Sequence, residues 1–336
     1  MPATLSATRP PTTQTNPSSH RRENAHIWAL VVGAGVVRAA GFSYPFRSYR
    51  CADLGLSTKG ISCVLALYGM AGSAGVRRAY TDDEVRDAYR AASWETFLGL
   101  HTFATSGVLV EEYLVGPEIS AETVVLDGGD VRVVAITRKR PGAEPRFQEV
   151  GHCVDANDPL LHDTAVLKAV TDAVRALGIE RGVQHVELRL THRGPAVTEV
   201  NSRPGGDLIP LLVAKATGID LPQAAAALAT GAVRDLTPTR VAAAAVGFLH
   251  PPVSGEVKAL SAPPDLRFEQ WLERLVRTRG PGDWVSAPPK SSIDDRLAHW
   301  VVTGADSAEC EMRLTQVLLQ VTARIDAPSD TTSCTR

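Results

Sequence analysis

Two short stretches near the middle of the chain decide how it is interpreted: His185-Val-Glu187, and Thr198-Glu199-Val-Asn201-Ser-Arg203-Pro-Gly-Gly-Asp207. Alternate side chains of a β-strand lie on the same face of the sheet. Glu199, Asn201 and Arg203 are therefore expected to project together from the second stretch. Two carboxylates, an amide oxygen and a guanidinium on one face indicate a magnesium site beside an anion-binding arginine.

Glu187 supplies the second carboxylate of this predicted site. Its two neighbours in the chain are apolar, so its strand is expected to be largely buried, where an unpaired carboxylate is costly. Binding a metal ion would remove that cost. We predict that Glu187, Glu199 and Asn201 bind a divalent cation beside Arg203. The alternative is a set of edge-strand charges followed by a polar loop.

The stretch Val108-Leu-Val-Glu111-Glu-Tyr113-Leu114-Val-Gly-Pro-Glu118 is expected to be a strand that leads into a Gly-Pro turn. Backbone groups beyond Tyr113 are free to pair with an adenine edge. Glu111 can accept a hydrogen bond from an exocyclic amine, and Glu118 can accept from ribose hydroxyls. The alternative is a solvated acidic face, which is the commoner explanation of two adjacent glutamates.

Two further motifs have a functional and a structural interpretation. Gly69-Met-Ala-Gly72-Ser73-Ala-Gly75 can fold its backbone around phosphate oxygens, or it is a plain hairpin turn. In Gln148-Glu149-Val-Gly-His152, the carboxylate can hold an amine and the imidazole can donate to a carboxylate or carry a proton. The alternative for the second motif is a loop with a surface histidine.

Composition excludes several classes of protein. Hydrophobic residues make up 44% and charged residues 21% of the 336 residues, which is typical of soluble globular proteins. The formal net charge of −2 predicts neither nucleic-acid nor membrane binding. The five cysteines form no Cys-x-x-Cys pair, so we expect reduced thiols and a cytoplasmic location.

Residues 21–41 imitate a secretory signal, with two arginines before an apolar run. That run is too short to span a bilayer, and we predict instead a buried strand that turns at Gly33-Ala-Gly35 into a helix. Elsewhere, Thr81 and Glu84 form a capping box. Periodicity predicts helices at 81–92, 164–177, 208–216, 222–230, 268–277 and 307–325. It predicts strands at 61–68, 108–113, 119–126, 131–137, 183–190, 196–200, 240–249 and 299–302.

In this order along the chain, the motifs resemble the ATP-grasp superfamily, and in particular its carboxylate–amine ligases, which include bacterial L-amino-acid ligases that make dipeptides. The similarity runs from about residue 54 to residue 325. It includes Val246-Gly-Phe-Leu-His-Pro-Pro252, which resembles the extra C-terminal domain of those ligases.

The resemblance implies an α+β fold in which two α+β subdomains grip ATP. We predict a disordered N-terminus at 1–25, a shortened remnant of the preceding α/β domain at 26–56, an ATP-grasp domain at 57–232, a small α+β C-terminal domain at 233–326 and a disordered tail at 327–336.

The resemblance also implies roles for the candidate residues. Those expected to contact ATP are Gly72, Ser73, Gly75, Glu111, Tyr113, Leu114 (through its backbone) and Glu118. Glu187, Glu199 and Asn201 match the ligands of Mg²⁺ (or Mn²⁺), and Arg203 matches the catalytic arginine that holds the transferred phosphate. Glu149, His152 and Arg203 would face the carboxylate and amine substrates. A homodimer is the expected assembly.

Two departures from the family pattern keep other functions open. Family members carry a phosphate-binding lysine in the strand before the glycine-rich loop, where this chain has Ala66, and either Lys59 or Lys139 could substitute. The domain before the ATP-grasp is short. One alternative is therefore an ATP-binding pseudoenzyme or partner subunit without full catalysis. Another is a carboxylase of the same superfamily that uses bicarbonate.

Overall fold

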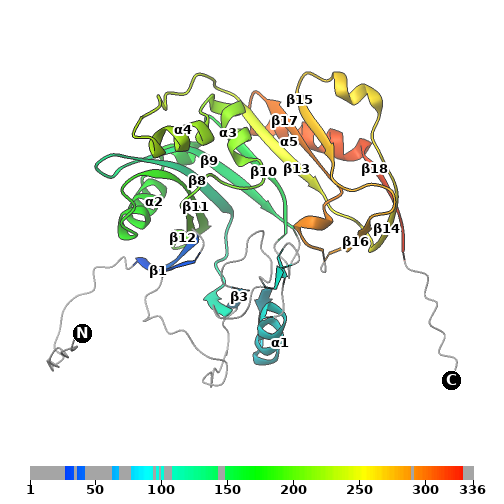
Figure 1. Cartoon of the computed structure of the whole chain (residues 1–336), viewed down its shortest axis with the longest axis horizontal. Helices are drawn as coiled ribbons and strands as arrows, with labels where there is room; N and C mark the ends of the chain where they lie inside the picture. Colours follow the sequence, from blue (N-terminus) through cyan, green and yellow to red (C-terminus); the bar gives the residue numbers. More distant parts are fainter. Residues whose placement is uncertain are drawn as a thin grey trace, which may run out of the picture.

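The computed structural model describes residues 27–33, 36–41, 63–67, 77–93, 96–97, 100–101, 108–142, 148–288 and 291–327. A ten-stranded sheet runs through the middle of the molecule, as Figure 1 shows. All of its strand pairs are antiparallel. In spatial order they are β1 (Ile27–Gly33), β2 (Val36–Gly41), β12 (Gly194–Asn201), β11 (Gly182–Thr191), β8 (Glu118–Leu126), β9 (Asp130–Pro141), β10 (Glu149–Asp155), β13 (Ala243–Leu249), β17 (Ala298–Gly304) and β15 (Leu272–Arg277).

Helix α2 (Thr164–Ala176) covers one face of this sheet. Asp163 caps its first turn and Gly178, at φ 65°, follows its end. Its Val166 and Val170 are fully buried against alternate residues of β8 and β11. The α2 face is therefore an ordinary apolar core, formed by side chains two residues apart on each strand.

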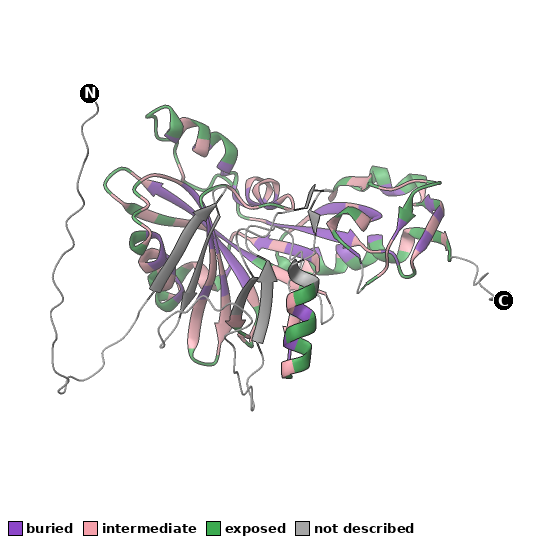
Figure 2. Cartoon of the chain, turned by 60° about the horizontal axis from the view of Figure 1, so that its bottom comes forward, coloured by how far each residue is buried: buried purple, intermediate pink, exposed green. Residues whose placement is uncertain are grey.

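Helices α3 (Ile209–Thr217) and α4 (Leu221–Ala229) pack on the other face, but only over part of it. They bury Val124 of β8 and Val183 of β11. Figure 2 shows that the buried residues lie mainly along the strands of the large sheet. The part of this face that α3 and α4 leave uncovered carries the polar residues described below.

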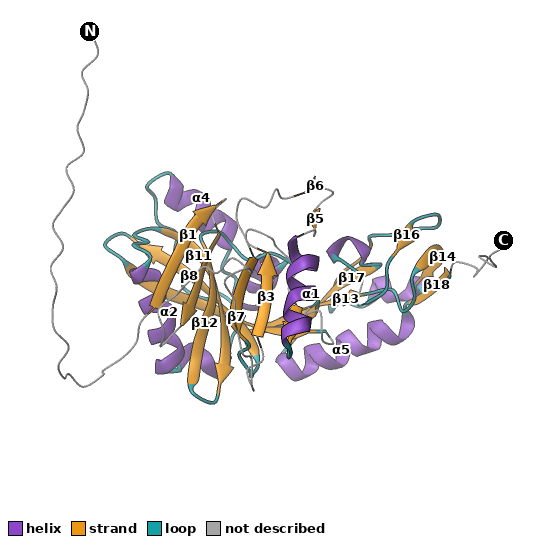
Figure 3. Ribbon diagram, turned by 90° about the horizontal axis from the view of Figure 1, so that it is seen from below, coloured by secondary structure: helices purple, strands orange, loops and turns teal. Residues whose placement is uncertain are grey.

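A smaller unit contains the three-stranded sheet β4 (Arg77–Ala79), β3 (Cys63–Leu67) and β7 (Val108–Glu112), with α1 (Asp82–Ser93) beside it. The predicted capping box is confirmed, because the Glu84 N–H donates to Thr81 Oγ1 and the Thr81 N–H donates to Glu84. Strands β5 (Thr96–Phe97) and β6 (Leu100–His101) form a separate pair. This unit lies below the large sheet in Figure 1 and in front of it in Figure 3, which views the molecule from below.

The C-terminal unit extends the large sheet through β13, β17 and β15 and adds helix α5 (Ser307–Gln320). A second sheet contains β16 (Trp284–Val285), β14 (Gly255–Ser261) and β18 (Thr322–Asp326). Short 3₁₀ helices occur at Pro159–His162 (η2), Pro264–Phe268 (η3) and Ile293–Asp295 (η4). Because β13 pairs with β10, the C-terminal unit shares a continuous sheet with the centre of the molecule.

The predicted hairpins at 119–137 and 183–200 and the helices at 164–177, 208–216 and 222–230 are confirmed within a few residues. Three predictions are wrong. Residues 268–277 are not a helix, because Leu272–Arg277 hydrogen-bonds to β17 as strand β15. The last helix ends at Gln320, and residues 322–326 alternate in exposure as strand β18. The segment after Gly33-Ala-Gly35 is strand β2, which pairs with β1 and β12.

The assignment of 26–56 to a separate preceding domain remains a prediction, although β1 and β2 extend the large sheet beyond β12. None of the helices within the described ranges is both long and apolar enough to cross a bilayer.

Candidate functional site

The strand register places the predicted metal ligands on one face of the large sheet. Glu187 of β11 lies opposite Glu199 of β12, and His185 lies opposite Asn201. Residues directly opposite one another in an antiparallel pair share a face, and so do residues two apart on one strand. Glu187, Glu199 and Asn201 are thus brought together with His185, which was not predicted as a site residue. This is the face that α3 and α4 leave partly open.

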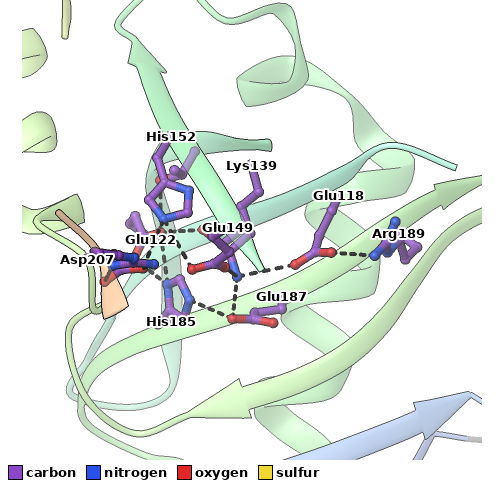
Figure 4. Close-up of polar contacts among 12 residues, drawn as sticks. Glu118, Glu122, Lys139, Glu149, His152, His185, Glu187, Arg189 and Asp207 are labelled. Carbon is purple, nitrogen blue, oxygen red and sulfur yellow. Dashed lines mark hydrogen bonds and ion pairs between the residues drawn. The ribbon is translucent and has the colours of Figure 1, made fainter. Parts of the chain in front are cut away.

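Around these strands lies a set of charged side chains, here called the polar cluster, shown in Figure 4. It contains Glu118, Glu122, Lys139, Glu149, His152, His185, Glu187, Arg189 and Asp207, together with Arg296. These residues come from β8, β9, β10, β11, the loop after β12 and the loop before β17.

Lys139 of β9 lies at the centre of the polar cluster. Its Nζ lies 2.6 Å from Glu187, 2.9 Å from Glu149 and 3.3 Å from Glu118, and its side chain is 5% exposed. Burial alone would lower the pKa of Lys139, but the three carboxylates outweigh it and hold the pKa well above its ordinary range. The ammonium group is therefore the counterion shared by the predicted ribose, substrate and metal positions.

His185 lies between two carboxylates. Its Nδ1 is 3.0 Å from Glu122, which is fully buried, and its Nε2 is 3.0 Å from Glu187 Oε1. Burial opposes the charged ring, yet Glu122 and Glu187 together raise the pKa of His185 to about 10. Glu122 also accepts hydrogen bonds from the hydroxyls of Ser120 and Thr137.

At the end of the polar cluster away from Glu118, Asp207 of the loop after β12 pairs with Arg296 of the C-terminal unit. Arg296 forms a bidentate ion pair with Asp207, at 2.7 and 2.8 Å, and lies over the Phe248 ring at 3.7 Å. His152 is fully buried, with Nε2 3.4 Å from Glu149 and 3.6 Å from Asp207. Burial opposes its charged form, but these carboxylates raise the pKa of His152.

The residues present fit a divalent cation at the predicted position. Asn201 is 2% exposed, and its Oδ1 has no hydrogen-bond partner among the described residues. A buried carbonyl oxygen without a donor is costly, and a cation beside Glu187 and Glu199 would satisfy it.

Glu149, His152 and Asp207 also converge closely enough to ligate a metal ion. One of these three groups is the imidazole of His152, whereas Mg²⁺ prefers oxygen ligands. Glu187, Glu199 and Asn201 offer only oxygen ligands and lie on one face of the sheet, so their position is the better candidate for Mg²⁺.

Residues 113–117 connect β7 of the three-stranded sheet to β8 of the large sheet, and Glu118 is the first residue of β8. Its carboxylate lies 2.5 Å from Arg189, which also donates to the Gly116 carbonyl. Gly116 has φ +149°, and a Cβ there would lie 2.1 Å from the Leu190 carbonyl oxygen, so the predicted Gly-Pro turn requires glycine. These contacts hold the connection between β7 and β8 against β11, next to the polar cluster.

The remaining predicted nucleotide residues lie on or just after β7. Glu111 is opposite Val64 of β3, and the Arg78 guanidinium lies 3.7 Å from the centre of the Tyr113 ring. Leu114 is half-buried in the link to β8. Gly72, Ser73 and Gly75 lie outside the described residues, as does Lys59.

Arg203 is not brought into the polar cluster. Its side chain is exposed and donates to the carbonyl oxygen of its neighbour Pro204. Strand β12 ends at Asn201, so the alternation that was expected to align Arg203 with Glu199 stops two residues too early. Arg203 nevertheless lies in the loop that directly follows the predicted metal ligands.

Two family models match this chain. The model of the ATP-grasp domain matches residues 60–210, and that of the L-amino acid ligase C-terminal domain 2 matches residues 247–326. The chain therefore contains an ATP-grasp domain followed by an L-amino acid ligase C-terminal domain. An L-amino acid ligase from Bacillus licheniformis has the same fold, with a TM-score of 0.65 and 23% identity over 83% of this chain and 66% of that one.

Other similar proteins match a smaller part of this chain. An uncharacterised protein, y4rH, from Sinorhizobium fredii is 33% identical over 55% of this chain, and human carnosine synthase 1 is 30% identical over 40%. The chain spans only 38% and 16% of their lengths. A biotin carboxylase domain from Hydrogenobacter thermophilus, solved with MgADP and bicarbonate, shares the fold at a TM-score of 0.56 and 17% identity, over 79% of this chain and 58% of that one.

Sequence reasoning missed several residues of the polar cluster. Glu122, His185, Arg189, Asp207 and Arg296 were not assigned roles, and Lys139 was named only as a substitute for a lysine at position 66. Strand alternation could have found both Glu122 and His185, because His185 lies two residues from Glu187 and Glu122 lies four residues from Glu118 on the same strand. The pairing of Asp207 with Arg296 spans 89 residues and left no local signal.

Proposed function

We propose that this chain is an ATP-dependent ligase that uses Mg²⁺ (or Mn²⁺) to join a carboxylate to an amine through an acyl phosphate, with amino acids as substrates. The observation that carries the proposal is the buried Asn201 Oδ1, which has no hydrogen-bond partner in the described part of the chain and lies on the same sheet face as Glu187 and Glu199. An amide oxygen and two carboxylates are hard oxygen donors of the kind that bind Mg²⁺ together with a nucleotide phosphate.

The nucleotide would lie between β7 and the polar cluster. In this arrangement the Leu114 N–H pairs with the adenine ring, with Glu111 and Tyr113 beside it, and Glu118 accepts from the ribose. The Glu112–Arg193 ion pair, at 2.7 Å, supports this placement because it joins the end of β7 to the turn between β11 and β12. Gly72, Ser73 and Gly75 would close over the phosphates and exclude water.

The proposed reaction has two steps. An oxygen of the substrate carboxylate attacks the γ-phosphorus of ATP, which forms an acyl phosphate and releases ADP. The amine then attacks the acyl carbon, the bond from that carbon to the phosphate oxygen breaks, and the nitrogen loses a proton as phosphate leaves. Mg²⁺, when bound, would neutralise charge on the phosphate oxygens.

This chain's own residues would hold the reacting groups. Arg203 would turn from the Pro204 carbonyl to the transferred phosphate, which offers a charge-assisted and stronger bond. Glu149 would hold the substrate amine. His152, between Glu149 and Asp207, would donate to a substrate carboxylate or carry the released proton.

The C-terminal unit favours a ligase over a bicarbonate-using carboxylase. It matches the C-terminal domain model of the L-amino acid ligases, and its Arg296 binds Asp207 at the proposed substrate end of the polar cluster. The likeness to biotin carboxylase structures supports the fold alone. Bicarbonate-stimulated ADP release, in the absence of amino acids, would contradict this choice.

The test is a screen for phosphate and ADP release over pairs of amino acids, with Mg²⁺ and with Mn²⁺, followed by mass spectrometry of the amide product. Glu187→Gln should reduce turnover about 100-fold or more, since several kcal/mol of charge stabilisation depend on the metal. Glu180→Gln, an exposed residue just before β11, is the matched control and should behave as wild type.

The alternative is a nucleotide-binding protein without turnover. It is favoured by Ala66, which lies in β3 opposite Leu109 where the family pattern has a phosphate-binding lysine. Saturable binding of ATP with Mg²⁺, without ADP release for any amino-acid pair and without rescue by Ala66→Lys, would establish this alternative and exclude the ligase.

A further inference from the structure

Glu122 is a buried carboxylate that the proposed reaction does not use. It is fully buried on β8 and is two residues from Ser120, whose hydroxyl donates to it at 2.7 Å. The Thr137 hydroxyl donates at 3.0 Å, and both Glu122 oxygens lie 3.0 Å from His185 Nδ1. Burying a carboxylate is costly, and an apolar residue would stabilise the sheet at least as well. The presence of Glu122 therefore calls for an explanation other than stability.

The explanation lies on the far side of the His185 ring. Nε2 of His185 is 3.0 Å from Glu187 Oε1, and Lys139 Nζ is 2.6 Å from the same oxygen. Among the described residues, no hydrogen bond or ion pair uses the second oxygen, Oε2. Glu187 is therefore held by one oxygen while the other is left available.

The ring itself is fixed in place by packing. A Cβ at Gly205 would lie 2.8 Å from His185 Nδ1 and 3.1 Å from its Cε1, so the loop after β12 closes directly against the imidazole. The ring cannot rotate away without moving that loop. In addition, Asn201 lies opposite His185 in the strand register.

We propose that His185, held by Glu122, is a positioning residue for the metal ligand Glu187: it fixes Glu187 through Oε1 and presents Oε2 to the divalent cation. The inference rests on the proposed function, since it requires the metal to bind at Glu187, Glu199 and Asn201. Groups that orient a metal ligand in this way commonly change metal affinity by about 10- to 100-fold when they are removed.

The test measures Mn²⁺ binding to the full-length protein by electron paramagnetic resonance, with ADP present, and metal-free ADP binding by calorimetry. His185→Gln keeps one donor but cannot bridge two carboxylates, and it should weaken Mn²⁺ binding about 10- to 100-fold while metal-free ADP binding stays within twofold of wild type. His192→Gln, in the exposed turn of the same hairpin, is the matched control and should change neither value.

Two results would overturn the inference. If His185→Gln is folded and binds Mn²⁺ as wild type does, while Glu187→Gln does not, the metal site stands and His185 has no positioning role. If wild-type protein binds no Mn²⁺, the metal site of the proposed function itself fails. Glu122→Gln preserves the shape of the buried site and serves if His185→Gln does not fold. It should weaken Mn²⁺ binding in the same direction, and an unchanged affinity would also count against the proposal.

Discussion

The two faces of the large sheet are formed by the same strands, but one face is apolar and the other carries buried charged side chains. On β8, Ile119 and Ala121 face α2 in an apolar core, while Ser120 and Glu122 face the polar cluster, and all four are fully buried. The apolar face gains free energy from burial, whereas the polar face must offset the desolvation of its charges with ion pairs. The difference teaches that burial alone does not identify the apolar core of this protein.

Adjacent residues on β11 test this comparison most strongly. Val186 is fully buried in the α2 core, and Glu187 lies next to it in the polar cluster. Val186→Asp places an unpaired carboxylate in an apolar core, which costs several kcal/mol, on the order of the whole stability of about 5–15 kcal/mol, so the domain should unfold. Glu187→Gln should melt within a few degrees of wild type and lose turnover. Thermal unfolding followed by circular dichroism measures both, and equal melting temperatures for the two variants would refute the distinction.

Removing the central cation should produce the next largest effect. Lys139→Met leaves three carboxylates without their shared counterion, which should cost about 3–5 kcal/mol of unfolding free energy. Added Mg²⁺ should restore part of this loss, because a divalent cation can replace the ammonium charge beside Glu187 and stabilises only the folded state that binds it. Denaturant unfolding with and without Mg²⁺ is the measurement.

Lys168→Met provides the control for this variant. Lys168 forms an exposed pair with Asp172 on α2, at 2.5 Å, and exposed pairs contribute about 0–1 kcal/mol. If Lys139→Met and Lys168→Met destabilise the protein equally, Lys139 is not the central counterion of the polar face.

Much of the apolar side of this comparison could be predicted from the sequence, because its elements are defined by local signals. The hairpin at 119–137 follows from alternation on either side of Asp127-Gly-Gly-Asp130, and α2 follows from helical spacing that stops at Gly178. Residues 268–277 were predicted to be a helix, but the six residues Leu272–Arg277 mix apolar and charged side chains in an order that fits the period of a helix and that of a strand equally well. Their pairing with β17, some 25 residues away, decides the outcome.

The polar side could be predicted only in part. Glu187, Glu199 and Asn201 were found because two strands of one hairpin carry them, so alternation alone puts them on one face. Arg203 was misplaced relative to them because the strand ends before it. The Asp207–Arg296 pair and the three contacts of Lys139 depend on the order of strands in the sheet, and no pattern within the sequence encodes that order.

Alkaline pH offers a graded test of the polar face. The pKa of His185 is raised to about 10 in the folded protein, above its ordinary value near 6.5. The contribution of His185 to the free energy of unfolding is therefore complete below about pH 6.5 and is lost as the pH rises toward 10. Wild-type unfolding free energy should fall by about 2 kcal/mol between pH 7 and 9, at a slope of up to about 1.4 kcal/mol per pH unit. His152, whose pKa is also raised, acts in the same direction. His185→Gln should show a flatter profile in denaturant titrations at each pH, and identical slopes would contradict this account.

The smallest expected effect concerns position 66, where the family pattern has a phosphate-binding lysine and this chain has alanine. Ala66 lies in β3, and Lys139 of the large sheet is a charged alternative. Restoring the lysine should strengthen phosphate binding by roughly 1.5 kcal/mol, which corresponds to about a tenfold gain in kcat/KM for ATP. If Lys139 already contributes to phosphate binding, Ala66→Lys should improve turnover more in a Lys139→Met background than in wild type, provided that Mg²⁺ keeps that variant folded. A gain of equal size in both backgrounds would mean that the two positions act independently, and that the polar face does not replace the missing lysine.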